Sequence, residues 1–135
     1  MALYRLNTLK NNVLIPCDLV YTDNGKNVNL DYSCDDVKIS AEDKYPFFAL
    51  VKIRLILEKQ SMFILCNGCR ENVYPSGMSA IGLMAYELQV GKQATNLVNI
   101  FDPVDNFELI VSVERQKFYR DNWFESLKNS DIDLK

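Results

Sequence analysis

The stretch that decides the fold is SAEDKYPFFALVKIRLILEK, residues 40–59. Large apolar residues fill most positions from Phe47 to Leu57, a run that would suit either a buried helix or a strand. Ser40 to Asp43 matches the capping-box pattern, and Pro46 would fall in the first turn, where its missing N–H costs nothing. These signals and a length of roughly 16 residues favour a largely buried helix over about 43–59. Its polar side would be Lys52, Arg54, Glu58 and Lys59.

Residues before this helix predict strands. Segments 3–6 and 13–21 are apolar and β-branched, and Pro16 within the second predicts an edge strand or a bulge. Asp23 to Lys26 has turn composition. Residues 27–32 then alternate between polar and apolar, which predicts a returning strand.

Residues after the helix predict two further pairs of strands. Segments 62–66 and 69–74 flank Asn67-Gly68, which is the strongest short-range signal for a hairpin. Segments 83–90 and 96–101 are separated by Gly91-Lys92-Gln93, and Pro103 ends this block.

A second helix is expected near the C-terminus. Ser112 can cap a helix over about 112–128, whose apolar face is Tyr119, Trp123 and Leu127 at helical spacing. Residues 129–135 are expected to form a frayed tail. With 135 residues the chain is long enough for one domain. We therefore expect a single α+β domain over 1–128, with a mostly antiparallel sheet and two main helices, about 43–59 and 112–128, packed on one face.

Composition excludes several kinds of chemistry. The absence of histidine rules out His-based acid–base catalysis, Ser-His or Cys-His dyads and His metal sites. A net charge of −3 argues against a nucleic-acid binder. No apolar run reaches the roughly 18 residues of a membrane span, and the N-terminus does not resemble a signal peptide. We expect a cytoplasmic chain with free thiols at Cys17, Cys34, Cys66 and Cys69.

Cys66-Asn67-Gly68-Cys69 is a C-x-x-C motif. It could be a redox pair or half of a zinc site, but Asn-Gly at its centre favours a β-turn that makes the two cysteines neighbours across strands. The spacing of Cys17 and Cys34 does not provide a second zinc knuckle. A structural role is the favoured interpretation, with no metal and no cofactor.

The segment 70–78, RENVYPSGM, gathers polar groups around a Pro-x-Gly turn. One interpretation is a shaped loop whose Arg70 and Tyr74 hydrogen-bond the backbone. The other is a binding surface or a small polar pocket in which Arg70 holds an anion. Ser76 has no base to activate it, and Gly91-Lys92 lacks the rest of a P-loop.

Charge is unevenly distributed along the chain. Residues 17–43 contain seven acidic residues and two lysines, whereas residues 44–70 contain five basic residues and one acidic residue. Residues 102–125 again have an acidic excess. These charges could simply solvate the surface, or they could form an acidic face for a basic partner protein.

Four segments, CNGCRENVYPSGM, GLMAYEL, GKQATNLVNIFDP and VERQKFYRDNWFESL, resemble small bacterial proteins that lie beside polymorphic toxins. Within that group the chain is most similar to immunity proteins of contact-dependent growth inhibition systems. The resemblance covers roughly 44–128 and depends on the Arg70–Met78 loop and the Tyr119-x-x-x-Trp123-x-x-Ser126-Leu127 ending. Residues 1–43 lie outside it.

The resemblance implies a cytoplasmic protein that binds the C-terminal domain of one cognate toxin, often a nuclease with a basic cleft, and covers its active site. We expect a binding protein and not an enzyme, a monomer or weak homodimer, with no nucleic-acid or membrane partner. The expected partner-binding residues are Asp31, Asp35, Asp36, Glu42, Asp43, Arg70, Glu71 and Tyr74. One alternative is a small-ligand or regulatory module, either monomeric or homodimeric, that uses Arg70 and Tyr74 of the 70–78 loop. Another is an enzyme that uses a cysteine or carboxylate without histidine.

Overall fold

The computed structural model describes residues 1–77 and 82–133, and the fold is α+β with mostly antiparallel strands. The first half contains β1 (Ala2–Lys10), β2 (Val13–Asp23), β3 (Val28–Cys34), β4 (Val37–Asp43), α1 (Pro46–Glu58) and β5 (Met62–Ile64). The second half contains the 3₁₀ helix η1 (Asn67–Cys69), β6 (Val73–Tyr74), β7 (Met84–Gln89), β8 (Lys92–Asn99), the 3₁₀ helix η3 (Phe107–Leu109) and α2 (Val113–Asp133).

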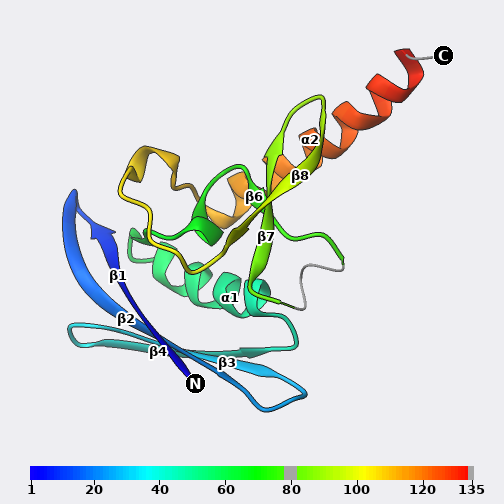
Figure 1. Ribbon diagram of the computed structural model, residues 1–135. Coiled ribbons are helices and arrows are strands. Elements are labelled where there is room, and N and C mark those ends of the chain that lie inside the picture. The colour runs from blue at the N-terminus through cyan, green and yellow to red at the C-terminus, as the bar shows by residue number, and fades with distance from the viewer. Residues whose placement is uncertain (78–81, 134–135) are drawn as a thin grey trace.

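The strands form two sheets and not one. The larger has five strands in the order β4-β3-β2-β1-β5, and the smaller has three in the order β6-β7-β8. Helix α1 packs on the large sheet, whereas α2 contacts the strands of the small sheet. Figure 1 shows α1 between the two sheets, and α2 extending away from them toward its C-terminal end. The expectation that both helices share one face of a single sheet is therefore wrong.

The core lies between the large sheet and α1. Alternate residues of the strands, such as Leu19, Leu30 and Tyr32, are buried on this inner face of the sheet. The buried side of α1 meets them with Phe47, Leu50, Ile53 and Leu57. The ring of Phe101, from the segment after β8, extends this core against the large sheet, because its centroid lies 4.9 Å from that of Tyr4 on β1.

The proline in β2 does not make it an edge strand. β2 pairs with β1 along an unbroken register that includes Pro16 opposite Asn7, and with β3 on its other side. However, β3 pairs only with residues 18–23 of β2. Pro16 thus lies where β2 has one neighbour, and no ladder bond on the open side requires its N–H.

Helix α1 does not begin with the predicted capping box. Residues Ser40 to Asp43 belong to β4, which pairs with β3 over its whole length. The N-cap is Tyr45, with no side-chain cap, and Pro46 opens the helix. Pairing with β3 therefore outweighs the local capping signal, and the helix is shorter than the predicted 43–59. Asp43 still accepts a hydrogen bond from the Tyr45 N–H at 2.9 Å.

The hairpin predicted at Asn67-Gly68 is also wrong. These residues form η1, and the strands beside it belong to different sheets, because β5 pairs with β1 and β6 with β7. The Gly68 N–H donates to the Ile100 carbonyl at 2.8 Å, so a contact distant in sequence fixes this turn.

The last elements agree better with expectation. β7 and β8 form a hairpin at Val90-Gly91, where Gly91 has φ 83°, although β8 begins earlier than predicted. Ser112 caps α2, since its Oγ accepts from the Arg115 N–H at 3.1 Å. The helix continues to Asp133, so it is longer than the predicted 112–128. Residues 134–135 and Met78 lie outside the described residues.

Candidate functional site

The large sheet has an outer face, on the side opposite α1, where strand alternation places exposed side chains. We define the outer face by residues 3, 5, 7 and 9 of β1, 14, 16, 18, 20 and 22 of β2, 29, 31 and 33 of β3, 38, 40 and 42 of β4, and Phe63 of β5. Two of its aliphatic side chains are about half exposed, Leu3 at 52% and Leu14 at 51%.

The strand registers arrange this face in rows. One row runs Leu3, Val20, Asp31 and Ser40 across four strands, and the next runs Arg5, Asp18, Ser33 and Lys38. At one end Leu9 lies between Leu14 and Phe63. Apolar side chains thus lie beside acidic ones, and two basic residues lie among them.

Two of the predicted acidic residues, Asp31 and Glu42, share the outer face. The Asp31 carboxylate accepts hydrogen bonds from the Asn29 amide at 2.9 Å and from the Ser40 hydroxyl. The Glu42 carboxylate accepts from the Asn27 amide at 2.9 Å. These hydrogen bonds orient both carboxylates and leave their charge unneutralised.

The other predicted acidic residues lie elsewhere on the large sheet. Asp35 and Asp36 are exposed in the β3–β4 turn, where Asp35 has φ 51°. That turn is about 20 Å from Glu42 at a rise of about 3.3 Å per residue, so it lies at the rim of the outer face. Asp43 is at the end of β4 and forms a 3.1 Å ion pair with Lys52 of α1, which places it outside the outer face.

Of the predicted loop residues, Tyr74 lies in β6 of the small sheet, whereas Arg70 and Glu71 lie between η1 and β6; Figure 1 shows α1 between this sheet and the large one. Arg70 pairs with Glu87 at 2.8 Å, and Glu71 with Arg115 at 2.6 Å. The Tyr74 ring packs on Phe47 of α1, with 5.0 Å between centroids, and burial raises its pKa. These three residues hold neighbouring elements together, and they do not form one surface with Asp31 and Glu42.

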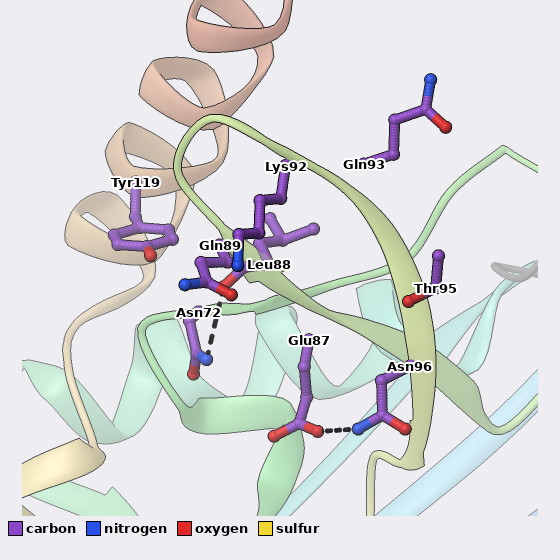
Figure 2. Close-up of a pocket in the computed structure, with 9 residues that line it drawn as sticks. All are labelled: Asn72, Glu87, Leu88, Gln89, Lys92, Gln93, Thr95, Asn96 and Tyr119. Atoms are coloured by element: carbon purple, nitrogen blue, oxygen red, sulfur yellow. Dashed lines mark hydrogen bonds between the residues drawn. The ribbon is translucent and has the colours of Figure 1, made fainter.

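The loop does border hollows, as the small-ligand alternative requires. One, of about 630 Å³, is lined by Asn72, Glu87, Leu88, Gln89, Lys92, Gln93, Thr95, Asn96 and Tyr119. Figure 2 shows Tyr119 coming from α2 and a hydrogen bond between Asn96 and Glu87. We call it the amide hollow. Arg70 lines a different hollow of about 260 Å³, and Tyr74 lines an apolar one of about 240 Å³ between α2 and the small sheet.

A buried polar network joins α1, η1 and α2, and the sequence did not predict it. Arg54 of α1, assigned above to an exposed polar side, is only 3% exposed. Its guanidinium donates to the Gln116 side-chain oxygen at 2.6 Å, to the Gly68 carbonyl at 3.2 Å and to the Val111 carbonyl at 3.0 Å. The Gln116 amide donates in turn to the carbonyls of Gly68, Arg70 and Val73. Helical spacing of Gln116 with Tyr119 and Trp123 was the available signal for its burial.

The cysteines of the C-x-x-C motif are buried in this region. Their sulfur atoms lie 3.6 Å apart across η1, and neither side chain is more than 1% exposed. The hydrogen bond with Cys69, together with burial, raises the pKa of Cys66. For Cys69, burial opposes ionisation, but the Cys66 hydrogen bond and the Arg54 charge outweigh burial and lower the pKa. Within the described residues no group of three or more Cys, Asp or Glu side chains is arranged to hold a metal ion.

No protein-family model matches the chain, and no curated protein matches its sequence. In the part of the chain that the structure describes, none of the helices has the length and apolar character needed to cross a membrane.

Proposed function

We propose that this chain is an immunity protein, which binds the C-terminal domain of a cognate toxin and neutralises it by covering its active site. The observation that carries the proposal is the outer face of the large sheet, where aliphatic residues, two of them half exposed, share one surface with unneutralised carboxylates. The sequence resemblance to immunity proteins of contact-dependent growth inhibition systems supports the same function.

The chemistry of the outer face suits a protein partner. Protein interfaces combine apolar anchors with a polar rim. Here Leu3 and Val20 begin the row that Asp31 and Ser40 continue, and Asp35 and Asp36 lie at the rim. The aliphatic residues would supply anchors, and the strands beneath them would hold these anchors in fixed positions.

The acidic excess on the outer face and its rim favours a basic partner protein. Asp18, Asp31 and Glu42 lie on the outer face, and Asp35 and Asp36 at its rim, against Arg5 and Lys38 on the same face. An acidic excess accelerates association with a basic cleft and fixes the orientation of the two proteins. A nuclease toxin, whose basic cleft binds phosphate, has the charge that is complementary to this acidic surface.

Binding to the C-terminal domain of the proposed toxin tests the proposal. We expect one-to-one binding that weakens as salt rises, and an Asp31→Lys variant that binds at least about tenfold more weakly. Glu125→Lys makes the same charge change on α2 and is the matched control. Equal losses for the two variants would place the interface away from the outer face, and no binding by the parent chain would contradict the function.

The amide hollow supports a second candidate function, binding of a small polar ligand. Its volume of about 630 Å³ is within the range of ligand sites, and its lining carries four amide side chains, one carboxylate and one amine. A screen of small polar compounds by thermal shift tests this candidate. A ligand whose stabilising effect disappears in Lys92→Ala and Asn96→Ala would support it, and a panel without any stabilising compound would count against it.

A further inference from the structure

Strand β4 leaves one edge of the large sheet open. It pairs with β3 over all seven residues without a bulge, and in the described residues the sheet order places no strand beyond it. The other sheet edges are less suited to pairing. β5 and β6 have only three and two residues. At β8 the Trp123 indole of α2 already donates to the Lys92 carbonyl at 2.8 Å.

The sequence of β4 and the residues beside it is complementary to itself in charge. Around Ser40, Lys38 and Glu42 lie at equal distances on either side, and so do Asp36 and Lys44. Lys38, Ser40 and Glu42 belong to the outer face of β4, whereas Asp36 lies in the β3–β4 turn just before the strand and Lys44 in the bend just after it. An antiparallel pair of β4 strands related by a two-fold axis at Ser40 would therefore place Lys38 opposite Glu42, and Asp36 opposite Lys44, twice each.

We propose that this chain forms a homodimer in which the β4 strands of two copies pair antiparallel about Ser40, joining the two large sheets into one. A two-fold interface uses the same patch on both copies, and an open sheet edge supplies unpaired backbone groups for the ladder. Residues directly opposite each other in such a pair have Cβ atoms about 5 Å apart, close enough for the opposite charges to interact.

Several registers of the β4–β4 pair would keep the inner faces of the two large sheets on the same side. The charges of the opposed side chains favour the register centred on Ser40. With Ile39 on the axis, Asp36 would lie opposite Glu42, and like charges opposite each other are unfavourable. With Ala41 on the axis, Lys38 would lie opposite Lys44. Of these three registers, only the one centred on Ser40 gives the charged side chains that face each other across the two strands opposite signs.

The groups that this pairing needs are accessible. Lys38, Glu42 and Lys44 are exposed, and the second oxygen of the Glu42 carboxylate is not used by Asn27. Lys52 donates to the Glu42 main-chain carbonyl at 2.6 Å, but a carbonyl oxygen can accept two hydrogen bonds. Because the ion pairs are exposed, the dimer should weaken as salt rises.

Sedimentation equilibrium of the purified chain over a range of concentrations, at low and high salt, tests the proposal. We expect a reversible monomer–dimer equilibrium. Lys38→Glu and Glu42→Lys each replace two attractive pairs by two repulsive ones, so each should weaken dimerisation by about tenfold or more. An equimolar mixture of the two variants should restore the dimer as a heterodimer. In that heterodimer both acidic side chains of the Lys38→Glu chain face basic side chains of the Glu42→Lys chain.

The double variant Lys38→Glu/Glu42→Lys restores opposite charges within one chain and should dimerise like the parent. A parent chain that stays monomeric, single variants that dimerise like the parent, or a mixture that fails to associate would each overturn the proposal. No toxin enters this experiment, so its outcome is independent of the proposed function.

Discussion

At the scale of single residues, the buried Arg54 guanidinium is the least expected feature of the molecule. Its hydrogen-bond acceptors are neutral, two main-chain carbonyls and the side-chain oxygen of Gln116. The sequence placed Arg54 on a solvated helix side because local periodicity cannot show that α2, over fifty residues away, brings Gln116 to it. A long-range polar contact of this kind has no local signal.

Replacing Gln116 should therefore be costly. Gln116→Leu leaves the Arg54 guanidinium one acceptor short and removes the donor shared by the carbonyls of Gly68, Arg70 and Val73. We expect the free energy of unfolding in urea to fall by about 2–4 kcal/mol. Lys117→Ala, an exposed neighbour on α2, should change it by less than about 0.5 kcal/mol. Similar values for both variants would show that the network contributes little.

Cys17 makes stability depend on alkaline pH. Burial raises its pKa from about 9 to about 11, so the folded state favours the neutral thiol. The stabilisation from the neutral Cys17 thiol is complete below the pKa that this thiol has in the unfolded chain. It is lost as pH rises from about 9 to about 11, which lowers the free energy of unfolding by roughly 2–3 kcal/mol. Urea titrations across this range should show a shallower decline for Cys17→Ala than for the parent. Parallel declines would mean that Cys17 does not ionise differently in the two states.

At the scale of elements, η1 packs closely between α1 and the segment that follows β8. A Cβ on Gly68 would lie 2.7 Å from the Leu50 Cδ2 atom and 3.1 Å from the Ile100 carbonyl oxygen. Gly68→Ala should therefore lower the free energy of unfolding by about 1–3 kcal/mol, measured in urea. Gly77→Ala is the matched control, because a Cβ there meets nothing within 4 Å. A Gly68→Ala variant as stable as this control would contradict the packing described here.

Elements with complete local signals were predictable. The turn after β2 forms where Asp23 and Asn24 accept hydrogen bonds from the next backbone N–H groups, and Ser112 caps α2. The capping box at Ser40 and the hairpin at Asn67-Gly68 failed for one reason. In both places a partner distant along the chain, β3 or the Ile100 segment, binds the backbone groups that the local motif would have used.

At the scale of the whole molecule, α1 separates the two groups of predicted partner-binding residues. Strand alternation could have placed Asp31 and Glu42 on one face only if residues 37–43 had been predicted as a strand. Nothing local indicated that Tyr74 belongs to a second sheet or that Arg70 pairs with Glu87 of that sheet. The acidic half of the candidate site was thus partly predictable, whereas its separation from the 70–78 loop required the tertiary fold.

The acidic residues at the rim of the outer face should control the rate at which a basic partner associates. Changing Asp35 and Asp36 together to Lys should slow association with the toxin domain and flatten its salt dependence, because exposed rim charges act mainly on the on-rate. Stopped-flow association at several salt concentrations measures both effects. An unchanged on-rate at low salt would place the interface away from the β3–β4 turn.

Neutralisation in living cells tests the central claim most directly. The C-terminal domain of the proposed toxin is expressed with the parent chain, with Leu3→Arg/Asp31→Lys on the outer face, or with Gln93→Arg on the small sheet, and growth is measured. We predict that the parent and Gln93→Arg restore growth and that the outer-face variant, produced at the same level, does not. Cells that stop growing even with the parent chain, or that are protected equally by all three proteins, would contradict the account.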